Sequence, residues 1–297
     1  GGVTDSRFRS MKMPVFHICG GCHLDRHLYL KGEAVPGRTN PASQRIGIGG
    51  VAANIARHLA PRGAQAHFTG VQPADEISAL GTRLRADGVD PNLIPLEGEV
   101  PGYTAIVAAD GELVVGAASM ALYDEVTPDM VLEGIIGDGP LVIDANFPEA
   151  VLQAICQAQP QTRPVFAAAT SVAKVGRLAG CLARLDALVL NRSEAAVLAG
   201  EAPVAGMACA LAARLRPGGA VLVSDGGNQA ALTTGDDCVK ASPPPLDLVR
   251  ANGAGDAMAA ALFWGLAATP DAGLAAHLEA ALEAGADFAA GRQAEQN

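Results

Sequence analysis

The residues best placed to do chemistry form the short segment Gly253-Ala254-Gly255-Asp256. The apolar run 257–268 follows it, so the pattern predicts a glycine-rich loop that opens a buried helix. Backbone N–H groups at such a start attract anions, phosphate above all. Asp256 could accept a proton from a hydroxyl that attacks a phosphate, and its place at the positive helix end predicts a low pKa. Taken alone, these residues are more typical of a capped tight turn.

A second glycine-rich segment, 47–50, opens another predicted helix, which carries Asn54 one turn later. There the backbone can approach a small polar ligand while the Asn54 amide binds its hydroxyls; a close helix–sheet contact is the alternative. The spacing also matches a dinucleotide-binding fingerprint, which needs a hydrophobic strand directly before it. Residues 38–45 are polar, so the sequence disfavours a nicotinamide-dependent dehydrogenase.

Apolar runs that alternate with helical patterns predict a parallel sheet covered on both faces. The predicted strands are 15–19, 66–71, 93–96, 141–144, 164–168, 187–190 and 220–224. The predicted helices include 75–87, 148–157, 172–182, 193–199, 206–215 and 272–290. A hairpin is expected over 103–118, turning at Asp110-Gly111, whereas 29–43 should be loop with at most one edge strand.

Polar residues follow several of these strands, where open parallel sheets bind ligands. They are Asp25, Asp144, Asn146, Asn191, Glu194, Ser224 and Asp225. Asn191 and Glu194 could hold the hydration shell of Mg²⁺, or form an ordinary helix start. The backbone of Gly226 offers an N–H group to an anion.

Composition narrows the classes of function. The chain has 297 residues, 49% of them hydrophobic, and a net charge of −10, which gives no basic surface for nucleic acid or an anionic membrane. The longest apolar run is too short to span a bilayer, and no signal peptide is apparent, so a cytoplasmic location is expected. The six cysteines are scattered and suggest buried thiols more than a metal site. Residues 1–10 are expected to be a tag remnant or a disordered tail.

Four motifs together resemble the ribokinase-like (PfkB) carbohydrate kinase family over nearly the whole chain. They are Gly49-Gly50-x-x-x-Asn54, Asn191-x-x-Glu194, Ser224-x-Gly226 and Gly253-Ala254-Gly255-Asp256. The resemblance implies one kinase domain over 11–297, a three-layer α/β/α sandwich with a mostly parallel central sheet. It also implies a small β lid from segments near 26–45 and 100–120, and a homodimer formed through that lid.

The resemblance also implies roles for individual residues. Asp256 would be the catalytic base, and Gly253, Ala254 and Gly255 would form the anion hole. The substrate would contact Asp25, Thr39, Asn40, Gly49, Gly50 and Asn54. ATP would contact Asn191, Ser224, Gly226 and Asn252, while Glu194 would hold Mg²⁺ through water. A monovalent cation such as K⁺ is a further expected cofactor.

Shorter strings look closer to the pseudouridine kinases of that family. They are Thr39-Asn40-Pro41, Gly49-Gly50-Val51-x-x-Asn54, Asp144-Ala145-Asn146 and Ser171-Val172-Ala173-Lys174. The implied reaction is phosphorylation of the 5′-hydroxyl of a nucleoside. The chain departs from the family pattern at His23, Ser119, Gln229 and Asn252. Ribose, adenosine or a keto sugar acid are therefore alternative acceptors, and a non-catalytic nucleoside-binding relative is an alternative of another class.

Overall fold

Nine strands form the central sheet, in the order β13-β12-β11-β10-β9-β8-β1-β4-β5. The computed structural model describes residues 13–246 and 253–292. The strands are β1 (Val15–Cys19), β4 (Gln65–Gln72), β5 (Val89–Pro95), β8 (Leu141–Asp144), β9 (Val165–Ala168), β10 (Ala187–Asn191), β11 (Ala220–Ser224), β12 (Ala230–Thr233) and β13 (Cys238–Ala241). The pairs from β5 to β11 are parallel, and β12 and β13 add an antiparallel edge.

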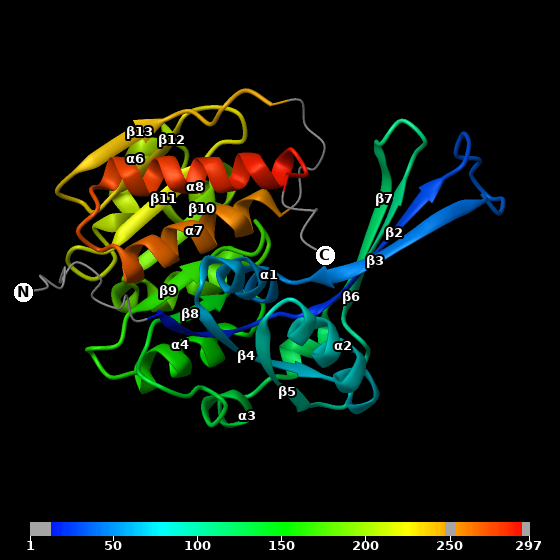
Figure 1. Ribbon diagram of the computed structural model, residues 1–297, viewed down its shortest axis with the longest axis horizontal. Helices are drawn as coiled ribbons and strands as arrows, with labels where there is room; N and C mark the ends of the chain where they lie inside the picture. Colours follow the sequence, from blue (N-terminus) through cyan, green and yellow to red (C-terminus); the bar gives the residue numbers. More distant parts are fainter. Residues whose placement is uncertain (1–12, 247–252, 293–297) are drawn as a thin grey trace, which may run out of the picture.

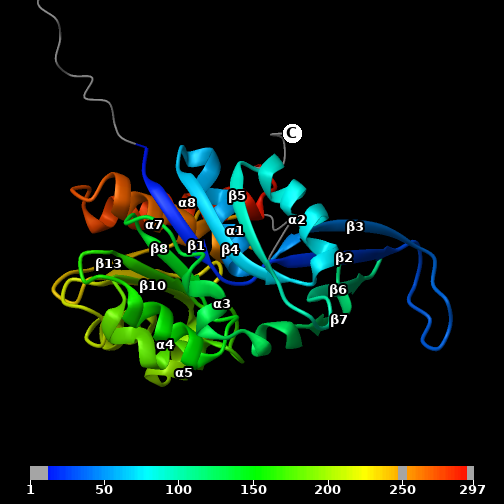
Figure 2. The same ribbon diagram turned by 90° about the horizontal axis from the view of Figure 1, so that it is seen from below.

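Helices cover both faces of this sheet, which confirms the predicted three-layer α/β/α architecture (Figures 1 and 2). One layer contains α1 (Val51–Leu59), α2 (Ala74–Ala86), α7 (Ala254–Ala268) and α8 (Leu274–Ala289). The other contains α3 (Pro128–Leu132), α4 (Glu149–Ala158), the 3-10 segment η3 (Val175–Arg184), α5 (Arg192–Ala199) and α6 (Val204–Ala212). Two apolar cores, one on each face, result from this arrangement. Because the central strands are buried on both sides, every residue of β8 and β9 is buried.

A separate four-stranded sheet, the small sheet, extends from the body (Figure 1). Its strands, in the order β3-β2-β6-β7, are β2 (His23–Leu30), β3 (Ala42–Gly49), β6 (Gly102–Val107) and β7 (Leu113–Ser119). The β6–β7 pair is the predicted hairpin. The predicted loop over 29–43 is confirmed for residues 31–41, since β2 ends at Leu30 and β3 begins at Ala42. The sequence interpretation did not include the long antiparallel pair that β2 and β3 form on either side of this loop. Most side chains of β2 are half-buried and most of those of β3 are exposed, and both strands carry several polar residues, so no apolar run marks them.

A strand therefore does precede the second glycine-rich segment, contrary to the sequence interpretation. It is β3, which is mostly exposed and lies in the small sheet, whereas a dinucleotide fingerprint follows a buried strand of the parallel sheet. The location of β3 in the small sheet therefore disfavours a dehydrogenase. A further difference is that 172–182, predicted as an α-helix, is replaced by the 3-10 segment at Val175–Arg184.

The strand order reverses at β1, which pairs with β4 on one side and β8 on the other. In an open α/β sheet, ligands bind outside the carboxyl ends of the strands at such a reversal. The segment after β1 contains Gly20 and Gly21, and β8 ends at Asp144. The topology therefore places the candidate site where β1, β8 and the start of α1 meet.

Candidate active site

Asp144 is the buried centre of that junction. Its carboxylate accepts hydrogen bonds from the backbone N–H groups of Gly21 (3.1 Å), Ala52 (3.0 Å) and Asn146 (3.0 Å). A Cβ on Gly20 would lie 2.5 Å from Asp144 Oδ1, so the glycine allows this close approach. Asp144 thus joins the β1 loop to the first turn of α1. Its side chain is committed to holding backbone in place.

Asn54 on α1 and Asp256 on α7 meet directly. Asn54 Nδ2 donates to Asp256 Oδ2 at 2.9 Å, although the two residues are far apart in the sequence. The orientation of the amide is fixed from its other side, since Arg57 donates to Asn54 Oδ1 at 3.3 Å. The structure therefore brings together the two glycine-rich helix starts that the sequence analysis singled out.

Gly253 makes the sharp entry to α7. Its φ of +97° is in the left-handed region that favours glycine, and a Cβ there would lie 2.8 Å from the Phe288 ring. A Cβ on Gly255 would meet no atom within 4 Å, so open space adjoins that residue. The N–H groups of the first turn of α7 are suited to an anion in this space. Asn252, predicted to contact the nucleotide, lies outside the described residues.

The predicted low pKa of Asp256 was wrong. Burial raises the pKa of this carboxyl to about 7, the Asn54 hydrogen bond opposes that rise, and the charges of Asp144, Glu194 and Asp25 add to it. The helix start alone would favour the carboxylate. Burial among other acids outweighs it here, and a group with such a pKa is suited to proton transfer near neutral pH.

The pKa of Asp256 gives a testable pH dependence. If only the carboxylate accepts the proton, kcat/KM should rise with pH around a midpoint near 7 and level off above it. Asn54→Leu removes the hydrogen bond that favours the charged form, so the midpoint should move to higher pH. The measurement is a pH–rate profile of both proteins. Asn92→Ala, which changes an exposed amide on β5, should keep the midpoint, and an unmoved midpoint in Asn54→Leu would contradict this account.

Asp25 lies on β2, at the base of the small sheet. Its Oδ1 atom is buried and has no hydrogen-bond partner within the described residues, although His23 Nε2 lies 3.3 Å away. A Cβ on Gly49 would overlap the Asp25 carboxyl group. Gly50 has a φ of +96° and packs against the backbone of Gly21. The two glycines thus make room for Asp25 and for the loop after β1, and the Asp25 carboxylate could accept a ligand hydroxyl.

The predicted nucleotide residues lie at the ends of adjacent strands. Asn191 ends β10 and Ser224 ends β11, where the two residues are in register. Gly226, with a φ of +56°, follows in an exposed turn. Asn191 and Glu194 form a capping box, in which each side chain accepts a hydrogen bond at 2.9 Å from the backbone N–H of the other. The ordinary helix start that the sequence left open is therefore present.

The two residues predicted to hold Mg²⁺, Asn191 and Glu194, both take part in this capping box. Burial raises the pKa of the Glu194 carboxyl group. In the described ranges 13–246 and 253–292, no group of three or more His, Cys, Asp or Glu side chains could hold a metal ion. A Mg²⁺ ion at this place would be held mainly by phosphate oxygens and water, and the Glu194 carboxylate would contact it through water.

Thr39 and Asn40 are not brought to this junction. They lie in the turn between β2 and β3, and β2 ends at Leu30, five positions beyond Asp25, or roughly 16 Å at the usual rise of a strand. Asn40 instead orders its own turn, since it accepts from the Val35 backbone N–H at 2.8 Å and donates to the Arg38 carbonyl at 2.9 Å. Their contact with substrate stays a prediction.

Sequence reasoning missed Tyr123, which connects several site segments. Its hydroxyl contacts the backbone of Cys22 and the ring of His23, and Lys174 lies 5.6 Å above the centre of its ring. Lys174 also donates to Asn146 Oδ1 at 2.8 Å. Tyr123 is fully buried between sequence-distant segments, so no local pattern marks it. The hydrogen bond from Lys174 to Asn146 joins the strings Asp144-Ala145-Asn146 and Ser171-Val172-Ala173-Lys174.

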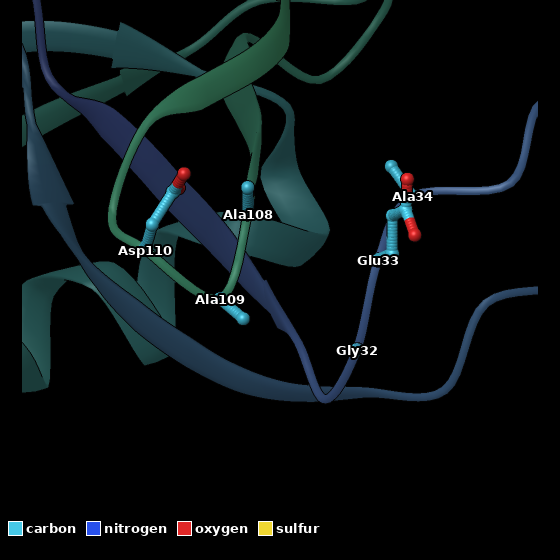
Figure 3. Close-up of a pocket in the computed structure, with 6 residues that line it drawn as sticks. All are labelled: Gly32, Glu33, Ala34, Ala108, Ala109 and Asp110. Atoms are coloured by element: carbon cyan, nitrogen blue, oxygen red, sulfur yellow. The ribbon is translucent and has the colours of Figure 1, made fainter.

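Two surface hollows lie on the small sheet, away from these residues. The larger, of about 420 Å³, is bounded by the turn after β2 and the β6–β7 turn (Figure 3). The other, of about 380 Å³, is lined by residues that include Leu28, Ile106 and Val114. Neither is lined by Asp25, Asn54 or Asp256. The candidate chemistry is located by the convergence of polar groups, which lies apart from these two hollows.

The fold and this junction define a sugar-kinase type of phosphotransferase, and the comparisons agree. The family model of the pfkB family carbohydrate kinases matches residues 24–292, so the chain belongs to that family. It transfers phosphate to a hydroxyl group, as these carbohydrate kinases do. The fold is ribokinase-like. No curated protein gives a significant sequence match.

Solved structures similar to this chain include a carbohydrate kinase from Agrobacterium tumefaciens, with 28% identity, a TM-score of 0.81, and coverage of 95% of this chain and 94% of that one. Arabidopsis thaliana ribokinase, solved with ribose and ATP, has 19% identity, a TM-score of 0.75, and coverage of 94% and 93%. Escherichia coli phosphofructokinase-2, in complex with substrates and products, has 20% identity, a TM-score of 0.76, and coverage of 94% and 93%. The last two support the fold alone.

Within the same described ranges, no single helix is both long and apolar enough to cross a membrane. The helices α5 and α6, bent by 51° to each other, meet the criteria of length and composition only when taken together.

Proposed function

We propose that the protein transfers the γ-phosphate of ATP to the 5′-hydroxyl of a ribose-containing nucleoside, converting pseudouridine to pseudouridine 5′-phosphate. The phosphotransfer rests chiefly on one observation, the 2.9 Å contact between Asn54 and Asp256. It sets a hydroxyl-binding amide beside a carboxylate at an anion-binding helix start. A protein that only bound nucleosides would not need a carboxylate there.

In the proposed reaction, the 5′-oxygen bonds to the γ-phosphorus as the bond from that phosphorus to the β,γ-bridging oxygen of ATP breaks. Asp256 takes the proton of the hydroxyl. The N–H groups of Gly253, Ala254 and Gly255 offset the charge on the transferred group. Asp25 and Asn54 hold the sugar, with Gly49 and Gly50 giving it room. Mg²⁺, when bound near Glu194, neutralises phosphate charge, and K⁺ is a further expected ion.

The nucleotide is assigned to the ends of β10 and β11. Asn191 and Ser224 are in register there, and Gly226 lies in the turn that follows. Polar groups at adjacent strand ends and exposed turn N–H groups suit the phosphates of ATP. Asn252 is also proposed to contact the nucleotide.

A nucleoside is favoured over a free sugar by the aromatic residues beside Asp25. Tyr103 is in register with Asp25, and His27 is two residues along the same strand, so the three side chains share one sheet face. The rings of His27 and Tyr103 meet edge to face at 6.2 Å. The Tyr103 hydroxyl lies 2.6 Å from the position of a Cβ on Gly116, so that glycine leaves space for the ring. A planar base attached to a sugar at Asp25 could stack there.

Pseudouridine in particular is supported by the network around Lys174. The two strings that look like pseudouridine kinases meet where Lys174 donates to Asn146 at 2.8 Å. Burial lowers the pKa of this lysine. Its place beside the Asp144 junction suits recognition of a polar acceptor. Ribose, adenosine and a keto sugar acid are the competing acceptors, because His23 and Ser119 depart from the family pattern.

An acceptor panel tests this proposal. Wild-type protein with MgATP should form ADP fastest with pseudouridine, measured against uridine, adenosine, ribose and a keto sugar acid. Tyr103→Ala should raise the KM of the nucleoside by about tenfold, because stacking on an aromatic side chain contributes about 1–3 kcal/mol per base. The KM of ribose should not change. Preference for ribose, or an equal effect of Tyr103→Ala on both acceptors, would overturn the nucleoside assignment.

We further propose that the small sheet is a lid and that two copies of the chain associate through it. Its edge strand β7 exposes Leu113 (59%), Val114 (47%) and Val115 (51%), and an exposed apolar edge strand favours pairing with another chain. Leu113→Lys/Val115→Lys should convert a dimer to a monomer in sedimentation at micromolar concentration. A wild-type monomer under those conditions would contradict the dimer.

A cytoplasmic location is proposed with this function. All six cysteines are free thiols, four of them buried, which suits a reducing compartment that supplies ATP.

A further inference from the structure

Asp25 and His23 form a close pair at the base of the small sheet. His23 Nε2 lies 3.3 Å from Asp25 Oδ1, and the His23 side chain is 7% exposed. Asp25 Oδ1 is buried and makes no hydrogen bond within residues 13–246 and 253–292. Because an unsatisfied buried acceptor is costly, an N–H group of the adjacent imidazole would stabilise this carboxylate.

The imidazole itself is held from its other side. His23 Nδ1 lies 2.9 Å from the Tyr123 hydroxyl, and the two rings are 6.0 Å apart. That hydroxyl is fixed in turn, since it lies 2.8 Å from the Cys22 carbonyl oxygen and accepts from the Cys22 N–H at 3.0 Å. Tyr123 is fully buried, and its ring packs edge to face against Phe147 at 6.0 Å. The support for His23 is therefore rigid.

The positions of the protons follow from these contacts. If the Tyr123 proton goes to the Cys22 carbonyl, His23 Nδ1 must donate to the hydroxyl oxygen. A ring with its proton on Nδ1 would then face Asp25 with a lone pair, and Asp25 would gain no donor. If the Tyr123 proton goes to His23 Nδ1, the neutral ring carries its own proton on Nε2. The Cys22 carbonyl then still accepts a hydrogen bond from Gln72 Nε2. The second arrangement places an N–H group toward Asp25 and would satisfy the buried Oδ1 atom.

We propose that His23 is a positioning residue, which donates its Nε2–H to Asp25 and fixes the carboxylate that binds the acceptor hydroxyls. The inference rests on the proposed role of Asp25 in the kinase reaction. One carboxylate oxygen is thus turned toward His23, and Oδ2 is left to accept a substrate hydroxyl. Because Tyr123 lies just beyond β7, the same chain of contacts ties the outgoing strand of the small sheet to the substrate site.

Two conservative variants separate positioning from packing. His23→Gln can place an amide N–H where Nε2 lies, and so keeps the contact to Asp25. His23→Asn places its amide nearer Nδ1, on the side of Tyr123, and does not reach Asp25. His23→Ala loses both contacts. His67→Ala is the matched control, because it removes another His–Asp pair, at 2.8 Å from Asp90, on β4 outside the site.

Steady-state kinetics with MgATP and the best acceptor among pseudouridine, adenosine and ribose tests the proposal. His23→Ala and His23→Asn should raise the acceptor KM at least tenfold, with the ATP KM within twofold of wild type. His23→Gln should recover most of the loss, and His67→Ala should change neither constant. Melting temperatures identify any variant whose fold is damaged, and Tyr123→Phe should shift the acceptor KM in the same direction by a smaller factor.

The outcomes distinguish this inference from the function on which it rests. An unchanged acceptor KM in His23→Ala, or equal effects of His23→Gln and His23→Asn, would overturn the positioning role alone if Asp25→Ala still raises the acceptor KM. An unchanged acceptor KM in Asp25→Ala would remove the binding role of Asp25, and the inference with it. Absence of turnover of every acceptor by the wild type would overturn the proposed function and leave no reaction for His23 to assist.

Discussion

Asp256→Asn should lower kcat by about a thousandfold or more while the protein stays folded. A general base contributes roughly 10²–10⁴ to a proton transfer, and an amide cannot accept the proton. The substituted side chain can still accept the hydrogen bond from Asn54, so acceptor and ATP affinities should change little. Rates from ADP formation at pH 8, with KM for both substrates, measure this. Asp271→Asn, an exposed acid beyond α7, should behave like wild type.

The stability of Asp256→Asn independently tests the raised pKa of the same carboxyl group. Its folded pKa of about 7 lies above the unfolded value of about 3.9, so the folded protein binds the proton more tightly. The folded state then loses stability as the pH rises from about 4 to 7. Asp256→Asn removes this cost, and its melting temperature at pH 8 should equal or exceed that of the wild type. A lower melting temperature would show that the carboxylate supports the fold.

Asp144→Ala should destabilise the protein by about 4 kcal/mol. The substitution leaves the N–H groups of Gly21, Ala52 and Asn146 without their acceptor in a fully buried position, and each such group costs about 1–3 kcal/mol. Since a domain is stable by about 5–15 kcal/mol, the variant should be near the limit of folding. Urea unfolding at pH 7 measures the difference.

Asp124→Ala provides the matched control for that experiment. Asp124 is an exposed carboxylate that pairs with Arg177 at 2.9 Å, close to the same network. An exposed ion pair contributes at most about 1 kcal/mol, so the control should stay near wild type. Equal losses in the two variants would contradict the central position given to Asp144.

The parallel sheet could be predicted closely from the sequence, because its strands are buried on both faces and appear as uninterrupted apolar runs. The predicted strands 15–19, 141–144 and 220–224 agree with β1, β8 and β11 to the residue. The small sheet was harder to predict, since β2 is mostly half-buried, β3 is mostly exposed, and polar residues interrupt the apolar ones in both strands. The antiparallel strands β12 and β13, at one end of the central sheet, were not predicted.

Several residues of the candidate site could be picked out from the sequence, but their contacts and the pKa of Asp256 could not. Asn54 and Asp256 were found from their glycine-rich loops, but nothing local in the sequence indicates that they touch. The pKa of Asp256 was predicted in the wrong direction, because the helix start is visible in the sequence whereas burial and the charges of Asp144, Glu194 and Asp25 arise only when distant segments meet. The same holds for Tyr123, whose partners Cys22 and His23 lie about a hundred residues away.

The most direct measurement is ³¹P NMR of the reaction of MgATP with pseudouridine, run with wild type and with Asp256→Asn at equal concentration. The wild type should produce ADP together with a phosphomonoester coupled to the 5′-methylene protons, and Asp256→Asn should produce neither within the same time. Formation of that ester at a near-normal rate by Asp256→Asn would contradict the role of Asp256 as the base. Release of inorganic phosphate alone by the wild type would contradict transfer to the nucleoside.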